Sequence, residues 1–421
     1  MLIRNGICLD TAYQYCDTSQ LIQKIEGGDT WTVDESTIDH CLARTVEPNC
    51  KLQFSVFVLA AVVACNFIKA IIMLWFLLSQ HEETFVTFGD ALTSWLENPD
   101  VTTKNRCLMS KLEVAVGKSV RRETRESLAQ YTWPNAPLFP TTFSNDETPR
   151  WHASVGPRRW TSTLVFCITA LVITTILLGI IPVIDRPEGA PNPLTAFTFG
   201  AVNPYAFIWI PIEGIRGFVA CVLLANLPQA CLSYLYLLYN GLFTCMHLAH
   251  EYSGYGVTRK ALRVTTPKGQ QRTTYWLQLP YRYSIPLIVT SGVLHWLVSQ
   301  SIFLVRVSIR EDEEASKDRT LSIVGYSCAP MMCTAIIILS MLITVLWVGQ
   351  RKLQSSMPLA GSCSVAIAAA AHRPDRDPDA AVLPVQWGAI ADSSESGSGH
   401  CCFTSEEVME PKEGTSYAGY L

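Results

Sequence analysis

The stretch FSVFVLAAVVACNFIKAIIMLWFLL, at residues 54–78, decides the class of fold. It contains one charged side chain, Lys69. A helix needs about 20 apolar residues to cross a hydrocarbon core of about 30 Å. Lipid offers no partner to an open backbone hydrogen bond, so such a stretch must be helical. The stretch is therefore long and apolar enough to form a transmembrane helix.

Four further stretches share this character, and together they predict an all-α, polytopic membrane helix bundle with about five transmembrane helices. The predicted spans are 54–78, 160–184, 217–239, 284–305 and 326–348, within a bundle domain at 53–350. Buried helices of a soluble protein are the alternative, but a soluble core does not need five such lengths. The composition agrees, because 49% of the residues are hydrophobic and 16% are charged, against about 25% charged in soluble domains.

Lysine and arginine are unevenly distributed between the predicted spans. The four intervening segments carry ten, two, six and four of them in order, and Arg351 and Lys352 follow the last span. Cytoplasmic loops are enriched in these residues. The pattern therefore predicts a plasma-membrane protein with its N-terminus outside, its C-terminus in the cytosol, and cytosolic loops at 79–159 and 251–283.

The segment 1–52 is predicted to be extracellular and contains an even number of cysteines. They are Cys8, Cys16, Cys41 and Cys50. Disulfides form in oxidising compartments, so these four cysteines are disulfide candidates with three possible connectivities.

Residues 351–421 differ in composition from the spans. RPDRDPD at 373–379 and SSESGSGH at 393–400 lack aliphatic periodicity, which predicts a mostly disordered cytosolic tail. Two short motifs, 385–387 and 401–403, are candidate docking sites for cytosolic protein partners. Cys401 and Cys402 are either S-acylated or ordinary reduced thiols, and we favour the thiols.

In the first cytosolic loop, residues 87–96 predict an amphipathic helix. Its apolar side comprises Phe88, Leu92, Trp95 and Leu96. Asn98-Pro99 ends it, because a residue before proline disfavours the helical conformation. Two locations are open for this helix: the membrane interface, which suits Phe and Trp, or the surface of the bundle.

Polar side chains recur along the third span at the spacing of one helix face. This stripe comprises Asn226, Gln229, Ser233, Tyr236, Asn240, Thr244, His247 and Glu251, and a shorter stripe on the fourth span comprises Ser291, His295 and Ser299. The favoured interpretation is hydrogen bonding between packed helices, at about 0.6 kcal/mol for each bond. The alternative is a polar path between the third and fourth helices.

The sequence predicts no catalytic residues, no metal site and no cofactor. It contains no nucleotide-binding loop, nucleophile elbow, HExxH motif or paired carboxylates. His247 and His250 beside Glu251 form only a partial ligand set, since zinc takes three or four ligands with matching geometry. The net charge of −4 gives no field that would attract nucleic acid.

Several stretches resemble a family of uncharacterised multi-pass membrane proteins of filamentous fungi, defined by a domain of unknown function. They are HCLARTVEPNCKLQFS at 40–55, FVTFGDALTSWLENPDVTT at 85–103, LPYRYSIPLIVTSGVLHWLVSQSIFLVRV at 279–307, MPLAGSCSVAIAAAAH at 357–372, PVQWG at 384–388 and GHCCF at 399–403. The resemblance implies a longer N-terminus with at least one further transmembrane helix, and it implies no activity.

The leading hypothesis is a non-enzymatic scaffold, sensor or surface component. Its expected partners are the lipid bilayer and, through the tail, cytosolic proteins. The alternative is a transporter or channel that uses the polar path, and a membrane enzyme is disfavoured because no reactive constellation can be named.

Overall fold

The computed structural model describes residues 32–33, 36–37, 56–79, 84–114, 141–144, 148–184, 199–200, 206–208, 214–309, 319–390 and 399–417. The chain divides into two units. The first comprises Met1–Thr84 with Arg186–Ala190, and the second comprises Phe85–Asp185 with Pro191–Leu421.

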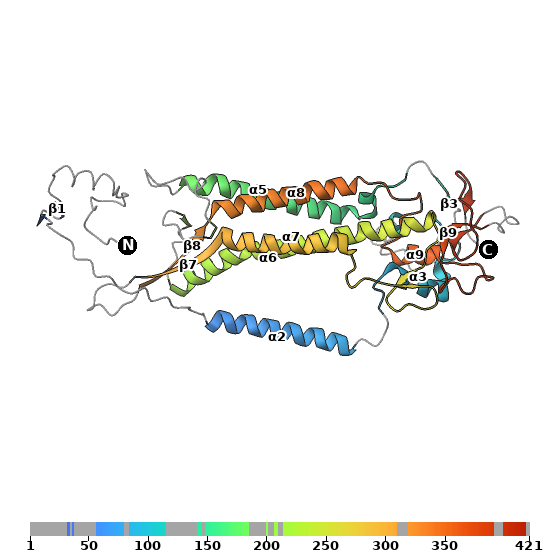
Figure 1. Cartoon of the computed structure of the whole chain (residues 1–421), viewed down its shortest axis with the longest axis horizontal. Coiled ribbons are helices and arrows are strands. Elements are labelled where there is room, and N and C mark those ends of the chain that lie inside the picture. The colour runs from blue at the N-terminus through green and yellow to red at the C-terminus, as the bar shows by residue number, and fades with distance from the viewer. Residues whose placement is uncertain are drawn as a thin grey trace, which may run out of the picture. The chain divides into compact units, whose positions relative to one another are not determined.

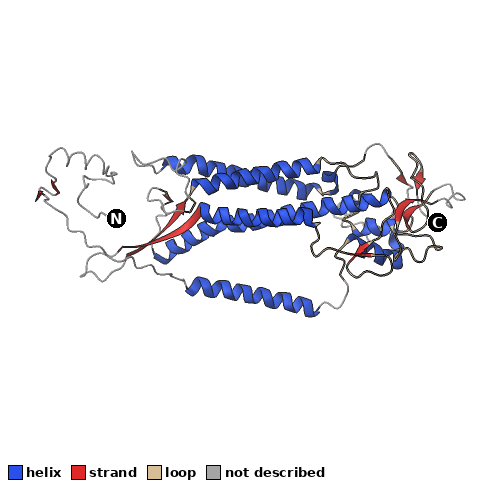
Figure 2. Cartoon of the chain, viewed as in Figure 1, coloured by secondary structure: helices blue, strands red, loops and turns tan. Residues whose placement is uncertain are grey.

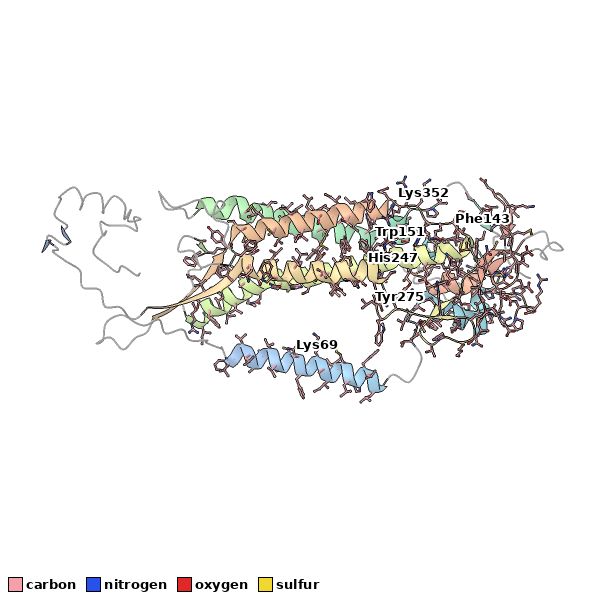
Figure 3. All side chains as sticks on the ribbon, in the orientation of Figure 1. Lys69, Phe143, Trp151, His247, Tyr275 and Lys352 are labelled. Atoms are coloured by element: carbon pink, nitrogen blue, oxygen red, sulfur yellow. The ribbon has the colours of Figure 1, made fainter. Side chains whose placement is uncertain are left out.

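The first unit contains one long helix, α2, at Val56–Ser79, which confirms a helix at the first predicted span. None of its side chains is buried, although nearly all are apolar, and Lys69 projects from it (Figure 3). Two short strands, β1 at Thr32–Val33 and β2 at Ser36–Thr37, pair in antiparallel fashion. The four disulfide candidates of the N-terminal segment lie outside the described residues.

Four helices of the second unit form a bundle. They are α5 at Pro157–Ile184, α6 at Gly214–Ser253, α7 at Tyr281–Ser301 and α8 at Cys328–Gly349. They run side by side (Figure 1), and α5 and α7 each pack against both α6 and α8, which closes a ring. Among the described residues, α2, α5, α6 and α8 are long and apolar enough to cross a membrane. The fourth predicted span, represented by α7, is a helix but is not among these four.

A β-hairpin replaces the end of the fourth predicted span. Helix α7 ends at Ser301 and continues into β7 at Ile302–Ile309, which pairs with β8 at Arg319–Tyr326. The prediction of helix up to residue 305 is therefore wrong. The β-branched side chains in IFLVRVSI favour a strand, and β8 supplies the pairing partner. Strand β4 at Phe207–Ile208 extends this sheet, so the chain is mostly helical but not all-α.

At the other end of the bundle from this hairpin lies a folded region that we call the head module (Figure 2). Its elements are α3 at Phe88–Glu97, η1 at Val101–Thr103, β3 at Thr141–Thr142, η5 at Gly254–Gly256, β5 at Arg263–Val264, β6 at Arg272–Thr273, α9 at Ser364–Ala370, β9 at Gln386–Ala389, β10 at Cys401–Thr404 and β11 at Ser416–Tyr417. Seven of these elements, α3, η5, β5, α9, β9, β10 and β11, contribute to one hydrophobic core. The head module is thus assembled from segments that lie before, between and after the bundle helices.

The prediction that residues 351–421 are mostly disordered is wrong for the described residues 351–390 and 399–417, which contain α9, β9, β10 and β11. Strand β10 pairs with β9, Phe403 faces Trp387 across this pair, and both side chains are buried. The alanine-rich helix α9 packs against α3, since small side chains allow a close approach. The tail supplies Ala366, Trp387, Phe403 and other buried residues of the head core, which it shares with α3.

The two docking motifs and the vicinal cysteines of the tail are part of this core. Residues 386–387 and 401–403 form the paired strands β9 and β10, so these side chains do not present a free docking surface. Cys401 and Cys402 are fully buried. Burial raises the pKa of both thiols, which keeps them protonated. The favoured interpretation, reduced thiols, agrees with this geometry.

The amphipathic helix predicted at 87–96 is confirmed as α3, but it lies in the core of the head module and at neither predicted location. Thr87 and Asp90 form a capping box at its start. The hydroxyl of Thr87 also donates to the carbonyl oxygen of Arg263 at 2.8 Å. A Cβ atom on Gly89 would lie 2.1 Å from the same oxygen, so only glycine permits this approach of α3 to β5.

Helix α6 belongs to both the bundle and the head module. Tyr239 and Phe243 are buried in the bundle core, whereas Tyr252, near the end of the helix, is buried in the head core. The ring of Tyr252 lies 5.3 Å from that of Phe88 and 5.6 Å from that of Phe403. At about 1.5 Å per residue this 40-residue helix is roughly 60 Å long, which carries it through the bundle and into the head.

Candidate ligand cavity in the helix bundle

A cavity of about 410 Å³ lies inside the ring of four helices, in the half nearer the β7–β8 hairpin. It is lined by Phe166, Thr169, Ala170, Ile173, Thr174 and Leu177 of α5, by Leu227, Pro228, Cys231, Leu232 and Leu235 of α6, by Val298, Ser301 and Ile302, and by Met331, Thr334 and Ile338 of α8. None of these lining residues is charged. The residues of α5 recur every three or four positions, so one face of this helix forms a wall of the cavity.

Three of the four hydroxyl groups in the lining donate hydrogen bonds within their own helices. Thr174 donates to the carbonyl oxygen of Ala170 at 2.8 Å, Ser301 to that of Leu297 at 2.7 Å, and Thr334 to that of Pro330 at 2.8 Å. Pro228 cannot donate a backbone hydrogen bond within α6. The lining therefore offers an apolar surface and no hydroxyl proton to a ligand at these three positions.

Both ends of the cavity are closed by packed side chains. Toward the head module, Tyr239 and Phe243 stack with their ring centroids 4.9 Å apart, in the core that fills that half of the bundle. Toward the hairpin, Met331 packs with Tyr326 and Ala206 in a small buried cluster. The cavity is therefore a pocket rather than a passage along the bundle.

Four members of the two polar stripes donate side-chain hydrogen bonds within their own helices. Asn226 donates to Val222 at 2.8 Å, Ser233 to Gln229 at 3.1 Å, Thr244 to Asn240 at 2.8 Å and Ser299 to Trp296 at 2.7 Å, in each case to the backbone carbonyl oxygen. Glu251 lies beyond the bundle and forms an ion pair with Arg263 of β5 in the head module. The structure thus disperses these residues among different partners.

Gln229 and His295 are the stripe members that bond to each other across two helices. His295 Nδ1 donates to Gln229 Oε1 at 2.6 Å, and Gln229 Nε2 donates to the backbone oxygen of His295 at 3.0 Å. Each side chain therefore satisfies a polar group of the partner helix. The pair joins α6 to α7 immediately beside Pro228.

We predict that Gln229→Ala and His295→Ala each lower the free energy of unfolding by roughly 1 kcal/mol. The double variant should lose less than the sum of the two, because the same pair of hydrogen bonds is removed in both. Thermal unfolding of the four proteins in detergent gives the coupling energy. Additive losses would show that the two side chains act independently.

Between α6 and α7, little space remains beside the other stripe residues. Tyr236 and Ser291 line a gap of about 10 Å³, together with Leu287, Leu294 and Met341. A cavity needs roughly 10–15 Å³ of such volume to hold one water molecule. The gap is thus at the lower limit for a single water, and it is not a continuous polar path.

His247 lies where the bundle meets the head module. Its ring centroid is 5.1 Å from that of Trp151 and 4.1 Å from that of Tyr283, and the Trp151 ring also contacts His250 at 4.9 Å (Figure 3). His247 Nε2, His250 Nδ1 and Trp151 Nε1 are buried and have no hydrogen-bond partner among the described residues. No group of three or more potential metal ligands occurs in the described part of the chain.

Sequence reasoning placed Gln229 and His295 on the stripes of the third and fourth helices, but it did not pair them, and it missed the cavity. The available signal was the coincidence of Pro228 with small residues such as Ala170 and Cys231 on facing helices. This signal becomes informative only once α5 and α6 are known to be neighbours.

The buried His400 makes the head module sensitive to acid. Burial lowers the pKa of His400 to about 4, although Nε2 donates to the carbonyl oxygen of His372 at 2.7 Å. An unfolded chain has a histidine pKa near 6.5 and binds this proton more tightly. Stability is therefore lost as the pH falls from about 6.5 to about 4, by about 3 kcal/mol in total.

We predict that His400→Gln flattens this pH dependence, because glutamine keeps a donor near the His372 carbonyl but does not titrate. Unfolding of the head module, followed between pH 7 and pH 4, tests the prediction. An unchanged slope in the variant would assign the acid sensitivity to other groups.

Residues 87–417 match the family described as Domain of unknown function (DUF8419). The match begins at Thr87, which caps α3, and ends at Tyr417 in β11, so both of its ends lie in the head module. The chain matches no curated protein and no solved structure. The resemblance to a family defined by a domain of unknown function is confirmed to that extent. Because the matched region covers the bundle and the head module together, the chain belongs to the DUF8419 family.

Proposed function

We propose that this chain is a multi-pass integral membrane protein with a non-enzymatic scaffold or sensor role, whose bundle holds the head module at the cytosolic face of the plasma membrane. The observation that carries this proposal is the continuity of α6, which has side chains in both the bundle core and the head core. A folded head fixed to a membrane bundle by a shared helix suits the presentation of a binding surface to cytosolic proteins.

Placement in a membrane is supported by the apolar surfaces of the helices. α2 has no buried side chain, and the outward faces of α5 and α8 carry many exposed aliphatic residues. α8 has 22 residues, or about 33 Å, which matches a hydrocarbon core of about 30 Å. We assign α7 as a fifth span in the same bundle because it packs between α6 and α8.

Exposed aromatic and basic residues support the orientation. Trp276 precedes α7 and is 96% exposed, and Trp347 near the end of α8 is 63% exposed. Both belong to the end of the bundle that carries the head module, where tryptophan is favoured at a membrane surface. Arg158, Arg282, Arg351 and Lys352 belong to this same end and are exposed. Basic residues favour the cytosolic side, so the head module is assigned there.

The scaffold role is favoured over transport by the packing between α6 and α7. The gap beside Ser291 is too small for a hydrated ion, and Gln229 and His295 are occupied by each other. The pocket inside the ring is apolar and closed at both ends. These contacts support hydrogen bonding between packed helices as the role of Gln229 and His295.

The test uses a charged, membrane-impermeant methanethiosulfonate reagent on Ser291→Cys and Thr266→Cys in whole cells, with labelled peptides identified by mass so that native cysteines are resolved. Thr266 is exposed in the head module and is the matched control. We expect Thr266→Cys to react only after permeabilisation, and Ser291→Cys not to react at all. Labelling of Ser291→Cys at the rate that Thr266→Cys shows in permeabilised cells would support a polar path. Labelling of Thr266→Cys on intact cells would place the head module outside the cell and so contradict the proposed orientation.

A further inference from the structure

We propose that the cavity inside the bundle binds one acyl chain of a membrane lipid, which makes this protein a lipid-responsive scaffold or sensor. The inference rests on the proposed membrane placement of the bundle and goes beyond it, because it assigns a specific internal site rather than general contact with lipid.

The dimensions of the cavity suit a single hydrocarbon chain. Its volume of about 410 Å³ lies within the roughly 300–1,000 Å³ of typical ligand pockets. The lining of α5 runs from Phe166 to Leu177, eleven residues further along the helix, which corresponds to about 16 Å. The cavity is thus long in the direction of the helices, as the bilayer orientation of an acyl chain requires.

The chemistry of the lining disfavours water, ions and polar headgroups as occupants of the cavity. A buried water needs two to four polar partners, and the hydroxyl protons of Thr174, Ser301 and Thr334 are already donated to backbone carbonyls. No charged side chain lines the cavity, so neither an ion nor a polar headgroup gains a partner there. Hydrocarbon loses no hydrogen bonds on entering such a site.

The cavity is reached from the side of the bundle. Ile173 of α5 is 52% exposed and Leu227 of α6 is 60% exposed, although both line the cavity, and Cys231 is exposed as well. An acyl chain can therefore enter between α5 and α6 from the hydrocarbon core while its headgroup stays in the bilayer interface. Pro228 leaves α6 without one backbone hydrogen bond at this level, which eases bending of the helix at the entrance.

Occupancy of the cavity bears on α6 directly. Leu232 and Leu235 line the cavity and also belong to the bundle core that contains Tyr239. An acyl chain that packs against them stabilises the α6 segment leading to the head module. This is the route by which lipid binding would influence the head.

The test is photolabelling of the full chain, reconstituted in phosphatidylcholine vesicles that contain a palmitic acid analogue with a diazirine near the end of its chain. Adducts are located by peptide mass. We expect adducts on cavity-lining residues of 166–177 and 227–235 that saturate with probe concentration and are displaced by unlabelled palmitate. Adducts on outward faces of the helices should instead rise in proportion to the probe. Adducts that are confined to outward faces and never saturate would overturn the proposal.

Two variants fill the cavity, Ala170→Phe from α5 and Cys231→Phe from α6, and each should reduce the saturable adducts roughly tenfold by occupying the space of the ligand. The matched control is Ala230→Phe, the same substitution at an exposed position outside the lining, which should leave them unchanged. Equal saturable labelling in filled and control variants would contradict the proposal. The saturation curve of the wild-type protein tests whether the cavity binds the probe, even where a cavity-filling variant does not fold.

A wrong membrane assignment would give a result that differs from the absence of an acyl-chain site. If the protein is not a membrane protein, alkaline carbonate extracts the wild-type chain from the vesicles. A chain that resists carbonate and gives only non-saturating adducts is a membrane protein without this site.

Discussion

Replacing Phe403 by alanine is expected to lower the free energy of unfolding of the head module by about 3–5 kcal/mol. The Phe403 side chain is fully buried. Its ring contacts Phe88 of α3 at 6.0 Å, Tyr252 of α6 at 5.6 Å and Tyr255 of η5 at 5.8 Å, measured between ring centroids. The substitution therefore leaves a cavity where three separate segments of the chain meet, and these segments cannot collapse independently to fill it.

The measurement is denaturant unfolding of the detergent-solubilised protein, with limited proteolysis of residues 353–417 as a second readout. Met409→Ala is the control, because Met409 lies in the same part of the chain but is 53% exposed. A surface change of this kind alters stability by no more than about 0.5 kcal/mol. If the two variants unfold alike, the C-terminal segment does not contribute to the head core.

Replacing Arg263 by alanine is expected to cost about 3–5 kcal/mol, because it leaves a partly buried carboxylate without its partner. Arg263 donates to both oxygens of Glu251, from Nε at 3.0 Å and from Nη2 at 2.6 Å, and the two side chains are 10% and 20% exposed. Nη1 also donates to Thr274 at 2.7 Å. The guanidinium thus joins the end of α6 to β5 and the segment after β6, and it also complements the negative end of the α6 dipole.

A double-variant cycle of Arg263→Ala with Glu251→Gln measures the coupling of the pair. Arg263→Lys should recover only part of the loss, because lysine cannot donate two parallel hydrogen bonds to one carboxylate. The control is the more exposed pair Arg376–Glu406, whose side chains are 47% and 32% exposed, and Arg376→Ala should cost about 1 kcal/mol or less. Similar losses at the two arginines would contradict a special role for Arg263.

Both predictions concern the head module, where expectations from sequence were least accurate. The tail contains two polar segments, RPDRDPD and SSESGSGH, and the short apolar motifs at 385–387 and 401–403 suggested docking sites. Trp387 and Phe403 are instead core residues, whose partners on α3 and α6 lie more than 130 residues earlier in the chain. Local composition carries no information about a core that is shared between such distant segments.

More of the bundle than of the head module could be predicted from the sequence. Helices occur at all five predicted spans, because a long apolar run with satisfied backbone groups allows few alternatives. The main error was the extension of helix past Ser301, where the sequence of an apolar strand resembles the continuation of an apolar helix. Pairing with β8 decides between the two, and this pairing is a tertiary contact.

The stretch at residues 54–78, with its four counterparts, determined by itself that this chain contains helices of membrane-spanning length, because length and apolarity are local properties. The helical spacing of the polar stripe was likewise local, and it placed Gln229 on one face of its helix. Only the tertiary structure decided that Gln229 meets His295, that Glu251 meets Arg263, and that the C-terminal segment folds. It also decided where four helices fail to fill the space between them. These features depend on which side chains meet across separate segments, and periodicity within one segment cannot specify that.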